Sequence, residues 1–140
     1  MKKLVIRSHE DIENFCDERG ISVEEFNEPI EIDSNVTNCS WMFAGCNSFN
    51  QPVSIPEGAI ICDAMFLDCE AFNQPISIPH QVIYCTAMFS GCTNFNQSVE
   101  VPSSAQHYLN MFEGCKALEH HKVTLPEDIS AYAVYGFDEL

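Results

Sequence analysis

The chain has 140 residues and a mass of 15.8 kDa, which is the size of one domain. Hydrophobic residues make up 46% of it, including ten Phe, and this content excludes a disordered acidic tail. Twenty-one acidic residues stand against six basic ones, which gives a formal net charge of −15. Such a negative field repels phosphate groups, so it excludes direct binding to nucleic acids and disfavours anionic membrane surfaces.

The N-terminus predicts a cytoplasmic location. Met1 to Ile6 begins like a signal peptide, but Arg7 interrupts the apolar run before an h-region can form. No stretch elsewhere reaches the roughly 18 apolar residues of a membrane-spanning helix. We therefore expect a soluble protein without a membrane partner, in which the eight Cys do not form a disulfide scaffold.

Residues 1–22 are expected to cap one end of the fold. Leu4 to Ile6 predicts a short first strand. After Ser8, apolar residues recur at helical spacing, which predicts a helix over about residues 9–18. Gly20 is suited to end that helix.

Residues 23–126 contain a repeat with a period of 23 residues. Each complete unit has a Met-Phe pair, a Cys three residues after the Phe, and then an Asn-Gln pair. A unit this short cannot enclose a core, so neighbouring units must stack and bury one another's apolar residues. The aligned series are Met42, Met65, Met88 and Met111; Cys46, Cys69, Cys92 and Cys115; Cys39, Cys62 and Cys85; and Asn27, Asn50, Asn73 and Asn96.

Each unit also contains a short alternating segment that ends at a proline, such as Val53-Ser54-Ile55 before Pro56. The alternation predicts a strand with two inward side chains and one outward side chain, and the strands of successive units would form a narrow parallel sheet. The return path, around Met65 and Cys69, is expected to contain a short helical turn. The predicted fold is an α/β repeat, a solenoid of about five coils at the spacing of parallel strands.

We expect the whole chain to form one domain. Residues 1–22 would be its N-terminal helical cap, residues 23–126 its repeats, and residues 127–140 its C-terminal cap. In this second cap the side chains expected to cover the last coil are Tyr132, Val134, Tyr135 and Phe137.

The order of motifs within the period resembles the BspA-like bacterial leucine-rich repeat family. The shared pattern is Phe-Asn-x-Pro-[Val/Ile]-x-Ile-Pro followed by Met-Phe-x-x-Cys, and the resemblance covers residues 16–126. It implies a right-handed solenoid with strands on one face and short helices on the other. It also implies that an exposed face binds a ligand, usually a protein.

The polar and sulfur-containing series have structural interpretations that we favour over chemical ones. The Cys spacing differs from the closely spaced pairs of zinc sites, and the Cys lie in register with Phe, so we expect them in the core. The Asn series is either a polar groove for a ligand or a column of amides that bond the backbone at a bend, and we favour the second. No catalytic constellation or phosphate loop stands out, so we expect no enzymatic activity, no metal and no cofactor.

The distribution of charge carries the most functional information. Between Gly20 and Cys115 there is no Lys or Arg, whereas there are eleven acidic residues. Solubility explains an acidic protein, but it does not require the exclusion of cations from so long a stretch. A rigid solenoid that holds carboxylates at fixed intervals can imitate a row of phosphates.

The predicted function is therefore a non-enzymatic protein-binding module whose acidic face docks on a basic, nucleic-acid-binding protein. The specific form is an inhibitor that mimics nucleic acid, comparable to the anti-CRISPR proteins of phages, which would act in the host cytoplasm. The sequence sets no oligomeric state. The expected contact residues are Glu24, Glu25, Glu28, Glu31 and Asp33, followed by Asp63, Asp68 and Glu70.

The alternative is an adhesion or recognition module of the BspA-like type. It would bind a protein or a glycan through the outward side chains of the strand face, which are Glu31, Ser54, Ser77, Glu100 and Thr124.

Overall fold

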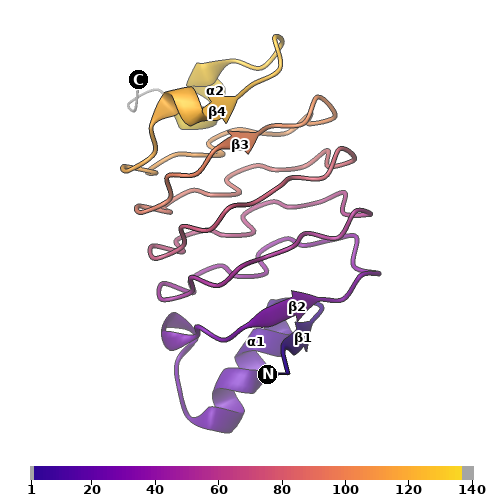
Figure 1. Ribbon diagram of the computed structural model, residues 1–140, viewed down its shortest axis with the longest axis vertical. Helices are drawn as coiled ribbons and strands as arrows, with labels where there is room; N and C mark the ends of the chain where they lie inside the picture. Colours follow the sequence, from indigo (N-terminus) through magenta and orange to yellow (C-terminus); the bar gives the residue numbers. More distant parts are fainter. Residues whose placement is uncertain (1, 137–140) are drawn as a thin grey trace.

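The computed structural model describes residues 2–136 and shows a chain that winds in successive coils stacked along one axis (Figure 1). The regular elements lie at the two ends of the stack. The first end contains β1 (Leu4–Ile6), α1 (His9–Arg19), the 3-10 helix η1 (Val23–Glu25) and β2 (Ile30–Ile32). The second end contains β3 (Val99–Glu100), η2 (His120–Lys122), β4 (Val123–Thr124) and α2 (Ala131–Tyr135).

Helix α1 covers the first end of the stack and lies where the sequence places it, within one residue. The backbone N–H of Arg7 donates to Asp11 Oδ2 at 2.8 Å, which secures the first turn. The helix ends at Gly20, whose φ of 67° is left-handed and favours glycine. Ile12 and Cys16 are buried, so one side of α1 packs on the coil beneath it.

The coils are joined by backbone hydrogen bonds on one side of the stack. Isolated parallel bridges link Asn38, Ile61, Tyr84 and His107 in successive coils. Within each coil, alternate N–H groups donate to the next coil, and the N–H groups between them donate three residues back in the same coil. We call this side the ladder face and define it as residues 38–45, 61–68, 84–91 and 107–114.

In the first such coil every backbone N–H from residue 39 to residue 46 donates a hydrogen bond, and that of Ser40 donates to the side chain of Asn38 at 2.9 Å. Bonds to the next coil run from the N–H groups of Cys39, Trp41, Phe43 and Gly45 to the carbonyls of Ile61, Asp63, Met65 and Leu67, at 2.7–3.0 Å.

The short helical turn expected in the return path is not found in the described part of the ladder face. Consecutive tight turns take its place, because a residue with left-handed φ occurs twice in each coil and interrupts any helix. These residues are Trp41, Ala64, Ala87 and Asn110, with φ of 51–60°, and Gly45, Asp68, Gly91 and Gly114, with φ of 59–79°.

The narrow parallel sheet expected from the alternating segments forms only at the ends of the stack, as the pairs β1–β2 and β3–β4. Within residues 2–136, segments 53–55 and 76–78 form no backbone hydrogen bonds to a neighbouring coil. Each of these two segments has a proline at both ends, whereas β2 and β3 each have one at a single end. Proline lacks the N–H that a ladder needs, so two prolines leave too few donors to pair the segment.

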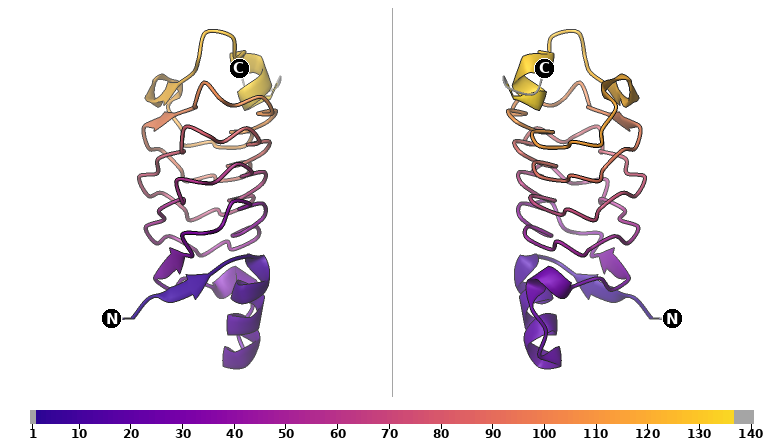
Figure 2. Two further views of the ribbon diagram at one scale, coloured as in Figure 1. Left: turned by 90° about the vertical axis from the view of Figure 1, so that its right-hand side faces the viewer. Right: turned by 90° about the vertical axis from the view of Figure 1, so that its left-hand side faces the viewer.

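The two columns of stacked Phe rings differ in their spacing along the stack. Stacked rings on the ladder face, from Phe43 to Phe112, are separated by 5.3–5.4 Å between centroids. The second column, from Phe26 to Phe95, has separations of 5.9–6.1 Å. Strands β1–β4 lie on the opposite side of the stack from α2 (Figure 2).

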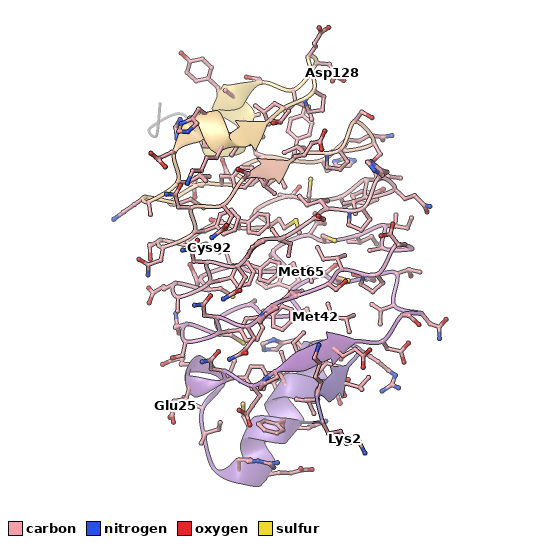
Figure 3. All side chains as sticks on the ribbon, viewed as in Figure 1. Lys2, Glu25, Met42, Met65, Cys92 and Asp128 are labelled. Atoms are coloured by element: carbon pink, nitrogen blue, oxygen red, sulfur yellow. The ribbon has the colours of Figure 1, made fainter. Side chains whose placement is uncertain are left out.

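The core is a set of columns that run along the stack. Met42 and Met65 occupy equivalent places in adjacent coils (Figure 3) and are fully buried. Thiols of the Cys column donate to carbonyls of the preceding coil, as from Cys69 Sγ to the Phe43 oxygen at 2.9 Å. Among the described residues no polar or charged side chain is buried. The core therefore consists of stacked apolar side chains, and the backbone hydrogen bonds set the register of successive coils.

The second end of the stack is closed by α2. The N–H groups of Asn110 and Phe112 donate to carbonyls of Ala133 and Val134 at 2.7 and 2.8 Å, so α2 extends the ladder face. Val134 and Tyr135 are buried as expected, but Tyr132 projects into solvent. It does so because the helix turns it away from the coil that Val134 and Tyr135 contact. Phe137, the fourth residue expected in this cap, lies outside the described residues.

Substitution of Gly91 by Ala tests the left-handed turns. Gly91 has φ of 79°, and a Cβ there would meet the carboxylate of Asp68 in the preceding coil. We expect Gly91→Ala to lower the free energy of unfolding by about 1–2 kcal/mol. Gly58→Ala is the matched control, since a Cβ at Gly58 meets no atom within 4 Å. Urea denaturation measures both, and equal effects would contradict the assignment.

Candidate functional site

Five of the eight predicted contact residues lie along one edge of the stack, which we call the acidic edge: Glu24, Glu25, Glu28, Asp68 and Glu70. Figure 3 shows Glu25 at the left-hand side of the molecule. The N–H of Ser48 donates to the Glu24 carbonyl at 3.1 Å, and the N–H of Ala71 donates to the Asn47 carbonyl at 3.0 Å. These bonds place Glu24, Asn47 and Glu70 one above another in successive coils.

A column of amides runs beside the acidic edge and fixes its backbone. Asn27 Oδ1 accepts the N–H of Asn50 at 2.9 Å, and Asn50 Oδ1 accepts that of Asn73 at 2.9 Å. The Gln that follows each Asn donates back to the Asn of the preceding coil. Of the two interpretations of the Asn series, the structure supports the structural one, since the amides bond the backbone at the bend.

The other three predicted residues lie elsewhere. Glu31 is exposed on β2, in register with Val5 of β1, so it belongs to the strand side. Asp33 pairs with Arg7 at 3.0 Å and accepts the N–H of Asn35 at 2.9 Å. The Asn35 N–H, with a contribution from the Arg7 guanidinium, holds the pKa of Asp33 below its usual range.

Asp63 is half-buried on the ladder face, and its Oδ1 accepts the N–H of Thr86 in the next coil at 2.9 Å. Asp33 and Asp63 thus serve the fold. The eight residues do not form a single surface, because a coil distributes its residues over two sides and two edges. The acidic edge is the part of the predicted site that the structure brings together.

The carboxylates of the acidic edge have no cationic partner within residues 2–136. The ion pairs of this part of the chain are Arg7 with Asp33 at 3.0 Å and Lys122 with Glu119 at 3.2 Å, and each lies near an end of the stack. Glu25 accepts a hydrogen bond from Ser22 Oγ at 3.1 Å. The edge is therefore a row of exposed carboxylates that form no ion pair in this part of the chain, and Lys116 is the cation that occupies the same position of the period, two coils beyond Glu70.

The strand side is grooved where the alternating segments are unpaired. A groove of about 700 Å³ lies between successive segments near the second end. It is lined by Ile76, Ser77, Val99, Glu100, Lys122 and Thr124, among others. Three of the five residues of the predicted strand face therefore line this groove, and Ser54 lines a neighbouring one.

The sequence interpretation missed a group of apolar side chains on the ladder face. Trp41, Tyr84 and Leu109 are exposed there, and in other units the residues at the positions of Trp41 and Leu109 are small or polar. A comparison of units position by position signals this group, since Trp41 stands where the following units have Ala64 and Ala87. The residues of this group are not among the repeated positions that define the period, so a search for the repeat does not find them.

The buried thiols form no metal site. Within the described chain no group of three His, Cys, Asp or Glu side chains is arranged to hold a metal ion. Burial raises the pKa of Cys46 and of Cys85 to about 12, and it raises the pKa of Cys69 and Cys92 well above the usual value. These thiols are protonated core side chains at neutral pH.

Comparison with known proteins gives a family. The sequence profile of the family described as "Mycoplasma protein of unknown function, DUF285" matches residues 21–125. The chain belongs to the DUF285 family. The matched range contains the 23-residue units, and the match is consistent with the resemblance to BspA-like repeats. No curated protein and no solved structure matches the chain.

None of the helices that this DUF285 chain forms within residues 2–136 combines the length and the apolar content that a membrane span needs.

Thiol labelling tests the placement of the cysteines. All eight are buried without disulfides, so we expect none to react with a thiol reagent at pH 8 in the native state, and all eight to react after denaturation in urea. Absorbance of the released thiolate measures the number of reactive groups. A cysteine that reacts in the native protein as fast as free cysteine would show that its coil is not closed.

Proposed function

We propose that this DUF285 chain is a non-enzymatic protein-binding module whose acidic edge docks on a basic, nucleic-acid-binding protein. The observation that supports this function is the row of exposed carboxylates without cationic partners. Carboxylates spread over a mixed surface would be partly neutralised by neighbouring Lys and Arg. In this chain the segment between Gly20 and Cys115 contains no Lys or Arg that could neutralise them.

Rigidity makes the acidic edge a defined surface. The side-chain amide of Asn47 donates to the carbonyl of Asp68 at 3.0 Å, and that of Asn94 donates to the carbonyl of Glu70 at 2.7 Å. Because their backbone is bonded to adjacent coils, the carboxylates project from fixed points. Less conformational entropy is then lost on binding than for an acidic tail.

The field of such an edge steers a basic surface toward it and raises the rate of association. It acts most strongly on proteins whose grooves accept phosphates. The specific form of the proposal is a cytoplasmic inhibitor that mimics nucleic acid, comparable in its action to the anti-CRISPR proteins of phages. A basic protein occupied by this edge could not bind its nucleic acid at the same time.

A second candidate is recognition through the strand side, as in adhesion modules of the BspA-like type, with the coils as the right-handed solenoid of that family. The groove between the segments around Ser77 and Glu100 favours it, because a groove offers a ligand more contact than a flat sheet. A protein or a glycan would contact the side chains of Glu31, Ser54, Ser77, Glu100 and Thr124.

Charge reversal at the acidic edge tests the first candidate. We expect wild-type protein to displace labelled DNA from a basic DNA-binding protein, and Glu24→Lys/Glu25→Lys/Glu28→Lys to lose at least about tenfold in potency. All three side chains are exposed, so the fold should persist. Competition at about 0.15 M and 0.5 M NaCl measures the effect, which should weaken at the higher salt concentration.

The control carries the same change of charge elsewhere. Glu100→Lys/Glu127→Lys/Asp128→Lys alters three exposed carboxylates away from the acidic edge, and we expect a smaller loss. If both triple variants lose potency equally, only net charge matters and the acidic edge is not the site. A loss confined to the control would favour the strand side.

A further inference from the structure

Trp41 combines two unfavourable features that the fold does not explain. Its side chain is 54% exposed, and its backbone has φ of 60°. A bulky residue in the left-handed region is an outlier that costs about 1–2 kcal/mol. The units that follow have Ala64, Ala87 and Asn110 at this position, with similar φ, so the turn does not need an indole. Strain that brings no gain in folding points to a role in function.

Other exposed apolar side chains lie on the same face. Five large hydrophobic residues of the described chain are exposed; three of them lie in three of the four ladder-face segments, at different positions of the period, and a fourth lies on α2. They are Trp41 at 54%, Tyr84 at 37%, Leu109 at 54% and Tyr132 at 57%, whereas the fifth, Val5 at 42%, lies on β1. The ring of Tyr84 stacks on His107 at 4.7 Å, which adds a second ring to the row.

The ladder face contains no Lys or Arg and only three carboxylates. Its segments 38–45 and 84–91 contain no Asp, Glu, Lys or Arg, although the chain as a whole carries a net charge of −15. Segment 61–68 contains Asp63 and Asp68, segment 107–114 contains Glu113, and the carboxylate of Asp63 bonds to the backbone of the next coil. Depletion of charge together with aromatic enrichment is the composition of the centre of a protein–protein interface.

The backbone holds this row rigidly. The N–H of Cys62 donates to the Tyr84 carbonyl at 2.7 Å, and the N–H of Ala87 donates to the Leu109 carbonyl at 3.0 Å. Trp41, Tyr84 and Leu109 are therefore each bonded through the backbone to a neighbouring coil. A preordered apolar row loses little entropy when it is covered.

We propose that the ladder face is the desolvated centre of the docking surface, and that it binds a protein partner whose contact surface has an apolar centre and a rim of Lys and Arg. The proposal rests on the proposed function, for which it names the partner's chemistry. Charge complementarity selects this occupant, because Asp68 and Glu113 lie near the ends of their ladder-face segments and Glu70 lies beside the face on the acidic edge. A second copy would bring two chains of net charge −15 together, so self-association is disfavoured.

Two peptides of equal length and equal Lys content separate apolar docking from attraction by charge. One contains Lys, Ser and Gly, and the other contains Lys, Leu and Phe. Trp41 is the only Trp of the chain, so its fluorescence reports on the ladder face directly. We expect the apolar peptide to bind at least about tenfold more tightly, to shift the emission of Trp41 to the blue and to protect it from quenching. The Lys-Ser-Gly peptide should leave the emission unchanged.

Two variants test whether the apolar peptide binds at the ladder face. Trp41→Asn introduces the residue that the chain itself has at position 110, so we expect a fold of equal or greater stability together with a loss of about tenfold in affinity for the apolar peptide. Val5→Ser is the matched control, since Val5 is an exposed apolar residue off the ladder face. Anisotropy of labelled peptide measures the affinities, and urea denaturation measures the stability.

Equal affinity for the two peptides, an unchanged emission of Trp41, or an equal loss in Val5→Ser would overturn the proposal. A wild-type dimer in sedimentation that Trp41→Asn dissociates would also overturn it, in favour of self-association. The proposed function fails separately. In that case the Lys-Ser-Gly peptide does not bind at low salt and charge reversal at the acidic edge has no effect, while the apolar peptide still shifts the emission of Trp41.

Discussion

The whole stack depends on hydrogen bonds between the backbones of successive coils on the ladder face. There, alternate N–H groups of one coil donate to carbonyls of the next, and the remaining N–H groups close tight turns within the coil. This pattern requires left-handed residues at fixed intervals, as at Gly45 and Gly91, so a helix cannot replace it. Because each bond joins residues 22 apart, any change in the length of a unit would disrupt the bonds of that coil with its neighbours.

The same register produces the functional surfaces. Side chains at one position of the period form a column, so a position occupied by amides gives a bonded ladder and one occupied by carboxylates gives a row of charge. Glu24 and Glu70 lie at one edge for this reason, whereas Trp41 and Tyr84 occupy different positions of the period on one face. The acidic edge and the apolar ladder face adjoin each other near Asp68, which allows one partner to contact both.

Several features follow from the sequence by simple physical rules. The helix of the first cap, the burial of the Cys and Phe columns and the amide ladder at Asn27 to Asn96 were all expected from spacing and residue type. The path of the backbone between these features does not follow from spacing and residue type. Alternation of Val53 to Ile55 is typical of a strand, but pairing needs donors in the neighbouring coil, and the prolines at both ends of the segment remove them.

By itself the sequence determined the period, the identity of the core residues and the excess of negative charge, because these are properties of residue type and spacing. Only the tertiary structure decided which carboxylates lie together and which serve the fold, since that depends on how a coil divides its residues between its sides. Asp33 and Asp63 cannot be distinguished from Glu24 in the sequence, yet Arg7 and the N–H of Thr86 engage the first two. Trp41 likewise became significant through its exposure and its left-handed backbone, and both are set by the contacts of its coil.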